Sequence, residues 1–183
     1  MKAFVVVLTV LLSGCAATTA LPEYSLAPDF ELTDRSNRQV TRKDLEGQVW
    51  IADFIFTRCT GICPAMSSNM AKLQNKLPKE VRLVSFSVDP AHDTPAVLSE
   101  YADRYNADSE RWFFLTGSAG AIEQLSVGGF KLALDPTAGS EAEPITHSSR
   151  FVLVDQQGHI RGYYGNEDPE ALDRLISDAR NLL

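Results

Sequence analysis

Two cysteines separated by three residues are the pair best suited to chemistry in this 183-residue chain. Cys59 and Cys63 lie in Thr57-Arg-Cys-Thr-Gly-Ile-Cys-Pro-Ala-Met66. Thiolates attack disulfides and also bind soft metal ions, so the pair fits redox chemistry or metal binding. A disulfide that only staples the loop is a third interpretation, although closing so short a loop removes little chain entropy. The spacing is one residue longer than CxxC, which favours two sulfurs converging on one ion.

The flanking residues predict that the cysteines lie where a buried strand meets a helix. The apolar run 49–56 is typical of a buried strand. Pro64 is tolerated only in the first turn of a helix, so Cys63 is expected at the helix start. A helix N-terminus favours negative charge, and we therefore expect it to favour the thiolate. Met66 and Met70 recur at helical spacing and are expected in the core.

The remaining elements predict an α/β fold. The same periodicities predict strands at 82–88 and 112–115, helices at 94–105, 118–127 and 169–181, and hairpins at 27–40 and 149–164. Residues 135–144 lack apolar periodicity and are expected to form a flexible loop. Strands joined through helices form parallel pairs, whereas hairpins add antiparallel ones. We predict a thioredoxin-like sandwich: a mixed central sheet, helices on both faces and an N-terminal β-hairpin.

Length, composition and charge limit the class of protein. The chain is 44% hydrophobic and 22% charged, as expected for a single globular domain. Its formal net charge is −7. Nucleic-acid binding needs clustered Lys and Arg, so an acidic chain of this kind is not expected to bind nucleic acid.

The N-terminal residues predict export and membrane anchoring. Lys2 precedes an apolar run that is too short to span a bilayer, and residues 1–14 are therefore interpreted as a signal peptide. Leu12-Ser-Gly-Cys15 resembles a bacterial lipoprotein box, in which Cys15 would be lipidated. Residues 15–27 would then be a lipidated tether and 28–183 the folded domain, in the cell envelope and facing the periplasm. A plain cleaved signal that discards Cys15 is the alternative.

The three histidines differ in their expected positions. His159 lies in a predicted turn and His92 in a predicted loop, and both are expected at the surface. His147 directly precedes the strand that would lie beside the cysteine-bearing strand in a thioredoxin-like sheet. It is therefore the candidate third ligand of a site with Cys59 and Cys63. Asp53, an acid within the apolar strand, is a candidate buried polar residue behind the dithiol.

Three motifs resemble those of the Sco/SenC/PrrC family of copper-binding assembly proteins. They are Phe54-Ile-Phe-Thr-Arg-Cys-Thr-Gly-Ile-Cys-Pro-Ala-Met66, Ser87-Val-Asp-Pro-Ala-His-Asp-Thr-Pro95 and Ile145-Thr-His-Ser-Ser149. The similarity covers the whole predicted domain, in the expected order. It implies that Cys59, Cys63 and His147 bind one copper ion, as Cu(I) or Cu(II), and that the two cysteines can also form a redox disulfide.

The resemblance also implies partners, and at one position this chain departs from the family's pattern. Family members assist assembly of the CuA site of cytochrome c oxidase subunit II, so that subunit or another exported copper protein is the expected recipient, with a separate protein as copper donor. Many members have an acid immediately before the metal-binding histidine, where this chain has Thr146. Asp89 is a candidate residue behind the ligands, although its position favours the role of capping the end of a strand.

Three functions remain open from the sequence. A metallochaperone would bind and transfer copper without being an enzyme. A thiol–disulfide oxidoreductase would use the same thiolates to reduce the cysteines of the oxidase copper site or of other exported proteins. A peroxidase is suggested only by the Ala27-Pro-Asp-Phe30 opening. His147 favours the metallochaperone, because a reductase has no use for an imidazole ligand.

Overall fold

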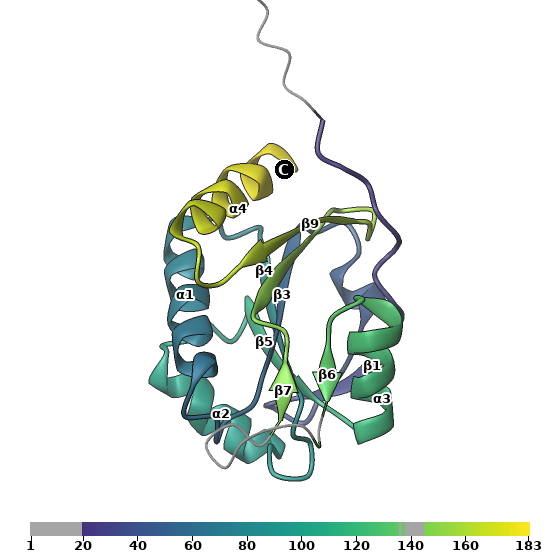
Figure 1. The fold of residues 1–183 in the computed structure, drawn as a ribbon, viewed down its shortest axis with the longest axis vertical. Coiled ribbons are helices and arrows are strands. Elements are labelled where there is room, and N and C mark those ends of the chain that lie inside the picture. The colour runs from purple at the N-terminus through teal and green to yellow at the C-terminus, as the bar shows by residue number, and fades with distance from the viewer. Residues whose placement is uncertain (1–19, 136, 138–144) are drawn as a thin grey trace, which may run out of the picture.

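The computed structural model describes residues 20–135, 137 and 145–183 (Figure 1). The predicted signal peptide, Cys15 and most of the predicted 135–144 loop lie outside the described residues. None of the helices among the described residues has the length and apolar character needed to cross a bilayer.

A seven-stranded mixed sheet forms the centre of the molecule. Its strand order is β2-β1-β5-β4-β3-β8-β9. The strands are β1 (Glu31–Asp34), β2 (Gln39–Thr41), β3 (Trp50–Ile55), β4 (Arg82–Ser87), β5 (Trp112–Thr116), β8 (Arg150–Val154) and β9 (Ile160–Gly165). The β3, β4 and β5 strands are parallel, and the other pairs are antiparallel. The predicted hairpins and mixed sheet are therefore confirmed.

Helices cover both faces of this sheet, as predicted. The helices are η1 (Arg42–Leu45), α1 (Ile62–Lys76), α2 (Pro95–Arg104), α3 (Ala119–Glu123), the π-helical segment η2 (Gln124–Gly129) and α4 (Pro169–Asn181). In Figure 1, α1, α2 and α4 lie on one side of the sheet and α3 on the other. The helix predicted at 118–127 thus begins as α3 and continues as η2. After η2 the chain forms the short strand β6 (Leu134–Asp135).

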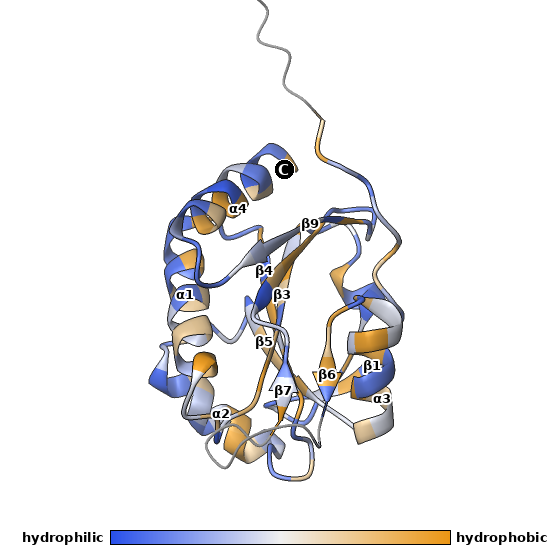
Figure 2. Cartoon of the chain, in the orientation of Figure 1, coloured by the Kyte–Doolittle hydropathy of each residue, from blue (hydrophilic) through white to orange (hydrophobic). Residues whose placement is uncertain are grey.

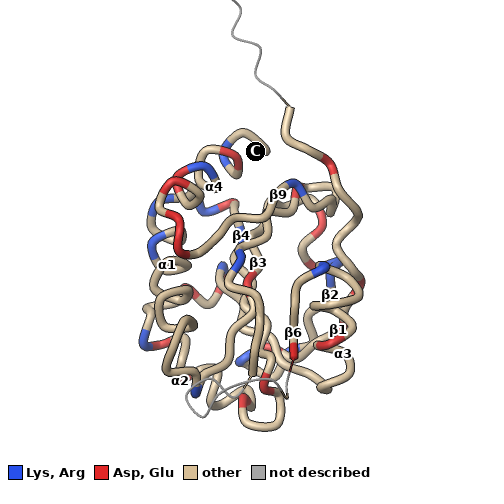
Figure 3. The backbone as a smooth tube through the Cα atoms, in the orientation of Figure 1, with Lys and Arg blue, Asp and Glu red and all other residues tan. Residues whose placement is uncertain are grey.

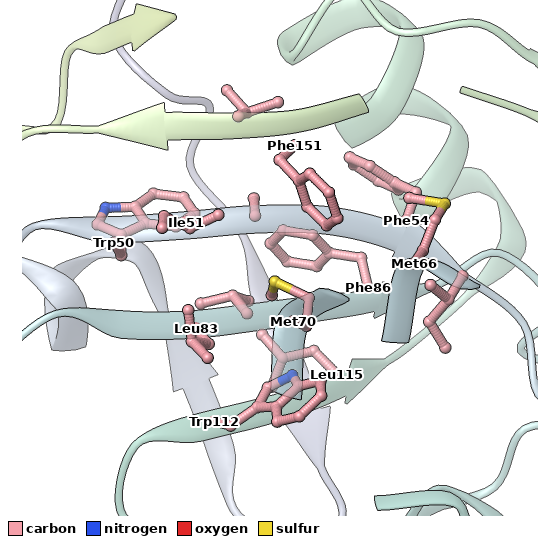
Figure 4. Close-up of a cluster of buried hydrophobic side chains, with 14 of the residues drawn as sticks. Trp50, Ile51, Phe54, Met66, Met70, Leu83, Phe86, Trp112, Leu115 and Phe151 are labelled. Atoms are coloured by element: carbon pink, nitrogen blue, oxygen red, sulfur yellow. The ribbon is translucent and has the colours of Figure 1, made fainter. Parts of the chain in front are cut away.

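The core is aromatic and lies on both faces of the central strands (Figure 4). On one face, the ring of Phe130 packs against those of Trp50, Phe54 and Phe86, with centroids 5.7–6.0 Å apart. Met66 and Met70 are fully buried in the same core, as the sequence predicted. Both sulfurs thus help hold α1, the helix that carries Cys63, against the sheet.

Most charged residues of the described chain lie at or near the surface of the helices and loops. Figure 2 shows α4 with hydrophobic residues on its inner side, where Ala171, Leu175, Ile176 and Ala179 are buried. Acidic and basic residues are intermixed along the helices and loops in Figure 3. The helix surfaces are thus chemically mixed and carry both signs of charge.

The residues before β1 are held against the β8–β9 hairpin. The backbone N–H groups of Tyr24 and Ala27 donate to Ile160 and Gly158, and Arg161 donates to the carbonyl oxygens of Leu21 and Pro22. The predicted 15–27 tether therefore includes a part, residues 21–27, that lies on the folded domain. This segment enters at the end of the molecule opposite β7 (Thr146–His147) (Figure 1).

Asp53 in β3 is buried among apolar side chains, as the sequence suggested. Its Oδ1 accepts a hydrogen bond from Ser85 Oγ at 2.6 Å, and Ser85 Oγ in turn accepts from the Trp112 indole. Its Oδ2 has no hydrogen-bond partner among the described residues. Burial raises the pKa of Asp53 to about 7, although the bond from Ser85 opposes this shift.

We predict that Asp53→Asn stabilises the fold at neutral and higher pH. The unfolded chain releases the Asp53 proton near the ordinary pKa of 3.8, whereas the folded state retains it up to about pH 7. The stabilisation from this proton is complete below pH 3.8 and is lost as the pH rises through 7. Ionised Asp53 then costs up to roughly 4 kcal/mol, which neutral Asn avoids.

Urea unfolding at pH 4, 6 and 8 measures this difference. The gain in unfolding free energy from Asp53→Asn should grow with pH and nearly vanish at pH 4. Asp173→Asn is the matched control, because the Asp173 side chain is 78% exposed. A gain of the same size at all three pH values would contradict the prediction.

Candidate metal centre

Antiparallel pairing of β3 with β8 brings the cysteines and His147 to one end of the sheet. β3 runs toward the Cys59 loop, while β8 begins three residues after His147, and the two strands pair through Trp50↔Val154 to Ala52↔Val152. β7 lies at the same end of the molecule as α2 (Figure 1). The structure thus brings together the three residues that the sequence predicted as one site.

The two cysteines lie at the start of α1, as predicted. The helix begins at Ile62, so that Cys63 lies in its first turn, and the Cys59 N–H donates to Phe56 O at 3.3 Å in the preceding loop. Cys59 is 6% exposed and Cys63 is fully buried. No disulfide joins them. Both sulfurs are therefore unbridged and lie behind the surface of the loop.

His147 is held in the orientation and tautomer that suit a ligand. Ser148 N–H donates to Ala133 O at 3.0 Å, and His147 pairs with Leu134 across β6 and β7. His147 Nδ1 lies 3.1 Å from the Ser148 carbonyl oxygen, which can only accept, so the proton is assigned to Nδ1. The lone pair of Nε2 then faces Cys63 Sγ at 3.1 Å.

The residue immediately before His147 does not supply this acceptor. The exposed residue at that position is Thr146. The imidazole is also packed against Phe56, whose ring meets it edge-on with centroids 5.7 Å apart. A backbone carbonyl and an aromatic ring therefore fix the ring of His147.

The three side chains offer donor atoms suited to a soft metal ion. One ligand atom from each of Cys59, Cys63 and His147 lies within 4.8 Å of the other two. With metal–sulfur and metal–nitrogen bonds of about 2.3 and 2.0 Å, ligand atoms around one trigonal ion lie roughly 3.8 Å apart. Shifts of about 1 Å or less would therefore suffice, and two thiolates with one imidazole fit copper in either common oxidation state.

The expectation of a thiolate at Cys63 is not supported in the metal-free protein. Burial raises the pKa of the Cys63 thiol well above its usual range, and this effect outweighs the hydrogen bond with the Phe56 backbone. Neighbouring Cys59 and Asp53 raise the Cys63 pKa further. Desolvation therefore dominates over the helix N-terminus. A cation bound between the sulfurs would supply the missing compensation for negative charge.

The loop between β4 and α2 forms hydrogen bonds with the two residues immediately before Cys59. Asp89 accepts from Arg58 Nε at 2.5 Å, and fully buried Asp93 accepts from both the N–H and the hydroxyl of Thr57. Ser87 Oγ donates to the same Asp93 carboxylate at 2.6 Å. Asp89 therefore contacts the site through Arg58. The role of Asp93 was not predicted from the sequence, although its position in the second family-like motif was a signal for it.

A second contact joins α1, the helix that carries Cys63, to the segment that carries His147. Asn69 Nδ2 on α1 donates to Asn166 Oδ1 at 2.9 Å, and Asn166 N–H donates to Ser149 O at 3.0 Å. Ser149 is two residues beyond His147. This pair was also missed, because a single Asn after a predicted strand resembles an ordinary turn residue.

The other two histidines are not members of the three-residue cluster. The His92 side chain is 46% exposed, which agrees with its predicted surface position. The His159 side chain is 30% exposed and lies 3.8 Å from Asp155 in the β8–β9 turn. His159 therefore belongs to the opposite end of the sheet from Cys59.

Comparison with known proteins assigns a family to this arrangement. The family model described as SCO1/SenC matches residues 18–183. The SCO1 protein homolog of Bacillus subtilis (strain 168) is 37% identical over 162 residues, which cover 86% of this chain and 82% of that protein.

Solved structures agree with this assignment. A SCO1/SenC family lipoprotein from Bacillus anthracis str. Ames is 35% identical with a TM-score of 0.79, covering 89% of this chain and 99% of that one. BsSco, a member of the Sco family of cytochrome c oxidase assembly proteins with an identified disulfide switch, is 36% identical with a TM-score of 0.77, covering 88% and 95%. Copper-bound ScoI of Bradyrhizobium japonicum, 22% identical with a TM-score of 0.72 over 87% of this chain and 100% of that one, shares the fold.

We predict that alkylation of the reduced, metal-free protein modifies Cys59 before Cys63. Cys59 is slightly exposed, whereas Cys63 is fully buried and burial raises its pKa. Timed reaction with iodoacetamide, followed by peptide mass spectrometry, gives the order. In guanidinium chloride the two rates should become similar, and faster modification of Cys63 in the folded state would contradict the prediction.

Proposed function

This chain belongs to the SCO1/SenC family, and we propose that it is a copper-binding assembly protein of the cell envelope. The observation that carries the proposal is the cluster of Cys59, Cys63 and His147, with ligand atoms within 4.8 Å of one another. One copper ion is bound by the two thiolates and by His147 Nε2. Copper is also the ion bound in the ScoI structure of Bradyrhizobium japonicum.

Copper loading of this site is coupled to loss of protons. Burial raises the pKa of the Cys63 thiol, and a copper ion is held by thiolates, so loading releases the Cys63 proton. The Ser148 carbonyl retains the Nδ1 proton of His147 and leaves Nε2 free of a proton for the ion. The buried position of Cys63 strengthens its interaction with the cation.

The copper is cargo, passed on to an exported recipient. Transfer proceeds by exchange of ligands with the recipient's thiols and needs no catalytic base, so the protein is not an enzyme in this role. The recipient is the CuA site of cytochrome c oxidase subunit II or another exported copper protein, consistent with BsSco being grouped with oxidase assembly proteins. A separate copper protein acts as donor.

Export and anchoring belong to the same proposal. Residues 1–14 direct export and Cys15 carries the lipid, as the lipoprotein-box resemblance implies. Acyl chains buried at about 0.8 kcal/mol per CH₂ then hold the domain at the membrane surface, facing the periplasm. The Bacillus anthracis relative is described as a lipoprotein, which supports this reading.

A thiol–disulfide oxidoreductase is the second candidate function. The observation in its favour is the unbridged Cys59–Cys63 pair at a helix start, together with the disulfide switch identified in BsSco. In this role the dithiol reduces the recipient's cysteines and becomes a disulfide itself. Catalytic turnover of a protein disulfide that is unaffected by His147→Ala would favour this function over copper transfer.

We predict that the reduced chain binds one copper ion tightly and that His147→Ala weakens binding. Removal of an imidazole ligand should cost at least about 100-fold in affinity, because even residues that only orient ligands cost 10–100-fold. Competition titration of Cu(I) and Cu(II) against chelators of known affinity measures both oxidation states. His159→Ala is the matched control and should bind as wild type does. Equal affinity of His147→Ala and wild type for both ions would rule out the three-ligand site.

The N-terminal proposal predicts an acylated Cys15 at the start of the mature protein. Intact-protein mass spectrometry after expression in a bacterial host that processes lipoproteins should find the mass of residues 15–183 plus acyl chains. Cys15→Ser should abolish acylation and release the domain from membranes. An unmodified wild-type N-terminus beyond residue 15 would refute the anchor.

A further inference from the structure

The buried position of the cysteines gives a ligand nearer the surface a possible part in receiving an incoming ion. Cys59 is 6% exposed and Cys63 fully buried, so neither sulfur is freely accessible. Copper in the envelope arrives bound to a donor, and ligand exchange replaces its ligands one at a time. An exposed ligand beside the cysteine loop would therefore speed the first exchange.

His92 occupies such a position. Its side chain is 46% exposed, and its Nδ1 lies 3.4 Å from the hydroxyl oxygen of Thr57. Thr57 is two residues before Cys59, and two Cα–Cα steps span at most about 7.6 Å. The imidazole thus lies beside the segment that leads into the first cysteine.

The hydrogen bonds of His92 select the tautomer that binds metals. Nδ1 lies 3.0 Å from Asp93 Oδ1, and the same oxygen accepts from the Thr57 hydroxyl at 2.6 Å. The carboxylate is an acceptor, so Nδ1 carries the proton and Nε2 bears a lone pair. Nε2 has no hydrogen-bond partner among the described residues, and a carboxylate that orients an imidazole in this way is typical of metal-binding histidines.

The imidazole is the ligand in this loop, and the carboxylates only support it. One ligand atom from each of Asp89, His92 and Asp93 lies within 4.8 Å of the others. However, Asp89 is paired with Arg58, and Asp93 accepts from the Thr57 N–H and the Ser87 hydroxyl as well as the groups above. A chelate would have to break these bonds, whereas Nε2 can bind without disturbing them.

We propose that His92 Nε2 is a receiving ligand for copper, which it binds transiently before the ion reaches Cys59, Cys63 and His147. This inference rests on the proposed function, because it assigns the route into the same site. Imidazole suits copper ions in this role. Because the residue only forms a transient contact, it affects the rate of loading and not the final affinity.

Two substitutions separate a ligand from a structural role. His92→Asn retains a side-chain N–H near Nδ1 that can donate to Asp93, but it removes the Nε2 lone pair. His92→Ala removes both. His159→Ala is the matched control, since that imidazole lies at the far end of the sheet.

Stopped-flow mixing with the Cu(I) complex of a colorimetric chelator measures the loading rate, and an equilibrium titration measures affinity. We expect both His92 variants to load about tenfold more slowly than wild type, with affinity within about twofold and His159→Ala unchanged. A normal rate for His92→Asn alongside a slow His92→Ala would indicate only a structural role and overturn the proposal. Normal rates for both would overturn it too. Failure of wild type to bind copper would instead refute the proposed function, and this proposal with it.

A second measurement isolates the outer ligand. In Cys59→Ser/Cys63→Ser/His147→Ala, Cu(II) electron paramagnetic resonance should show nitrogen coupling from an imidazole. That coupling should disappear when His92→Asn is added and persist when His159→Ala is added. A spectrum that does not depend on His92 would overturn the assignment.

Discussion

The site depends on the antiparallel pairing of β3 with β8. These strands are fixed in register from Trp50↔Val154 to Ala52↔Val152. Because they run in opposite directions, the end of one and the start of the other meet at the same edge of the sheet. Residues more than eighty positions apart in the chain, Cys63 and His147, thereby come to 3.1 Å between Sγ and Nε2. A change in the register of β8 against β3 would move the segment that carries His147 away from the cysteines.

Near that pairing, polar contacts hold the segment that carries Cys59 and the segment that carries His147. These contacts are made by neighbouring residues and not by the candidate ligand atoms themselves. Asp93 holds Thr57 on the cysteine side, and Asn166 links Ser149 on the histidine side to α1. The three candidate ligand atoms thus lie within 4.8 Å of one another in the metal-free protein, which would lower the ordering cost of binding an ion. Burial raises the pKa of the Cys63 thiol, so a cation would have to compensate the negative charge that solvent does not.

The sequence predicted the architecture well because its signals were local. Apolar runs, Pro64 in a first helical turn and the Gln156-Gln157-Gly158 turn each specify an element by its own residues, and the mixed sheet followed from their order. The protonation of Cys63 was predicted wrongly, because the helix terminus is visible in the sequence whereas the depth of burial is not. Asp93 and Ser148 were missed for the same reason: their roles depend on partners that only tertiary packing brings near.

The docking of residues 21–27 on the β8–β9 hairpin fixes where the N-terminal segment joins the fold relative to the cluster of Cys59, Cys63 and His147. Five hydrogen bonds of Tyr24, Ser25, Ala27, Leu21 and Pro22 fasten this segment at the end of the sheet remote from β7. The described N-terminal segment therefore joins the fold at the end opposite β7, which carries His147. A large molecule could therefore approach the end of the sheet that carries the cysteines without displacing residues 21–27 from the β8–β9 hairpin.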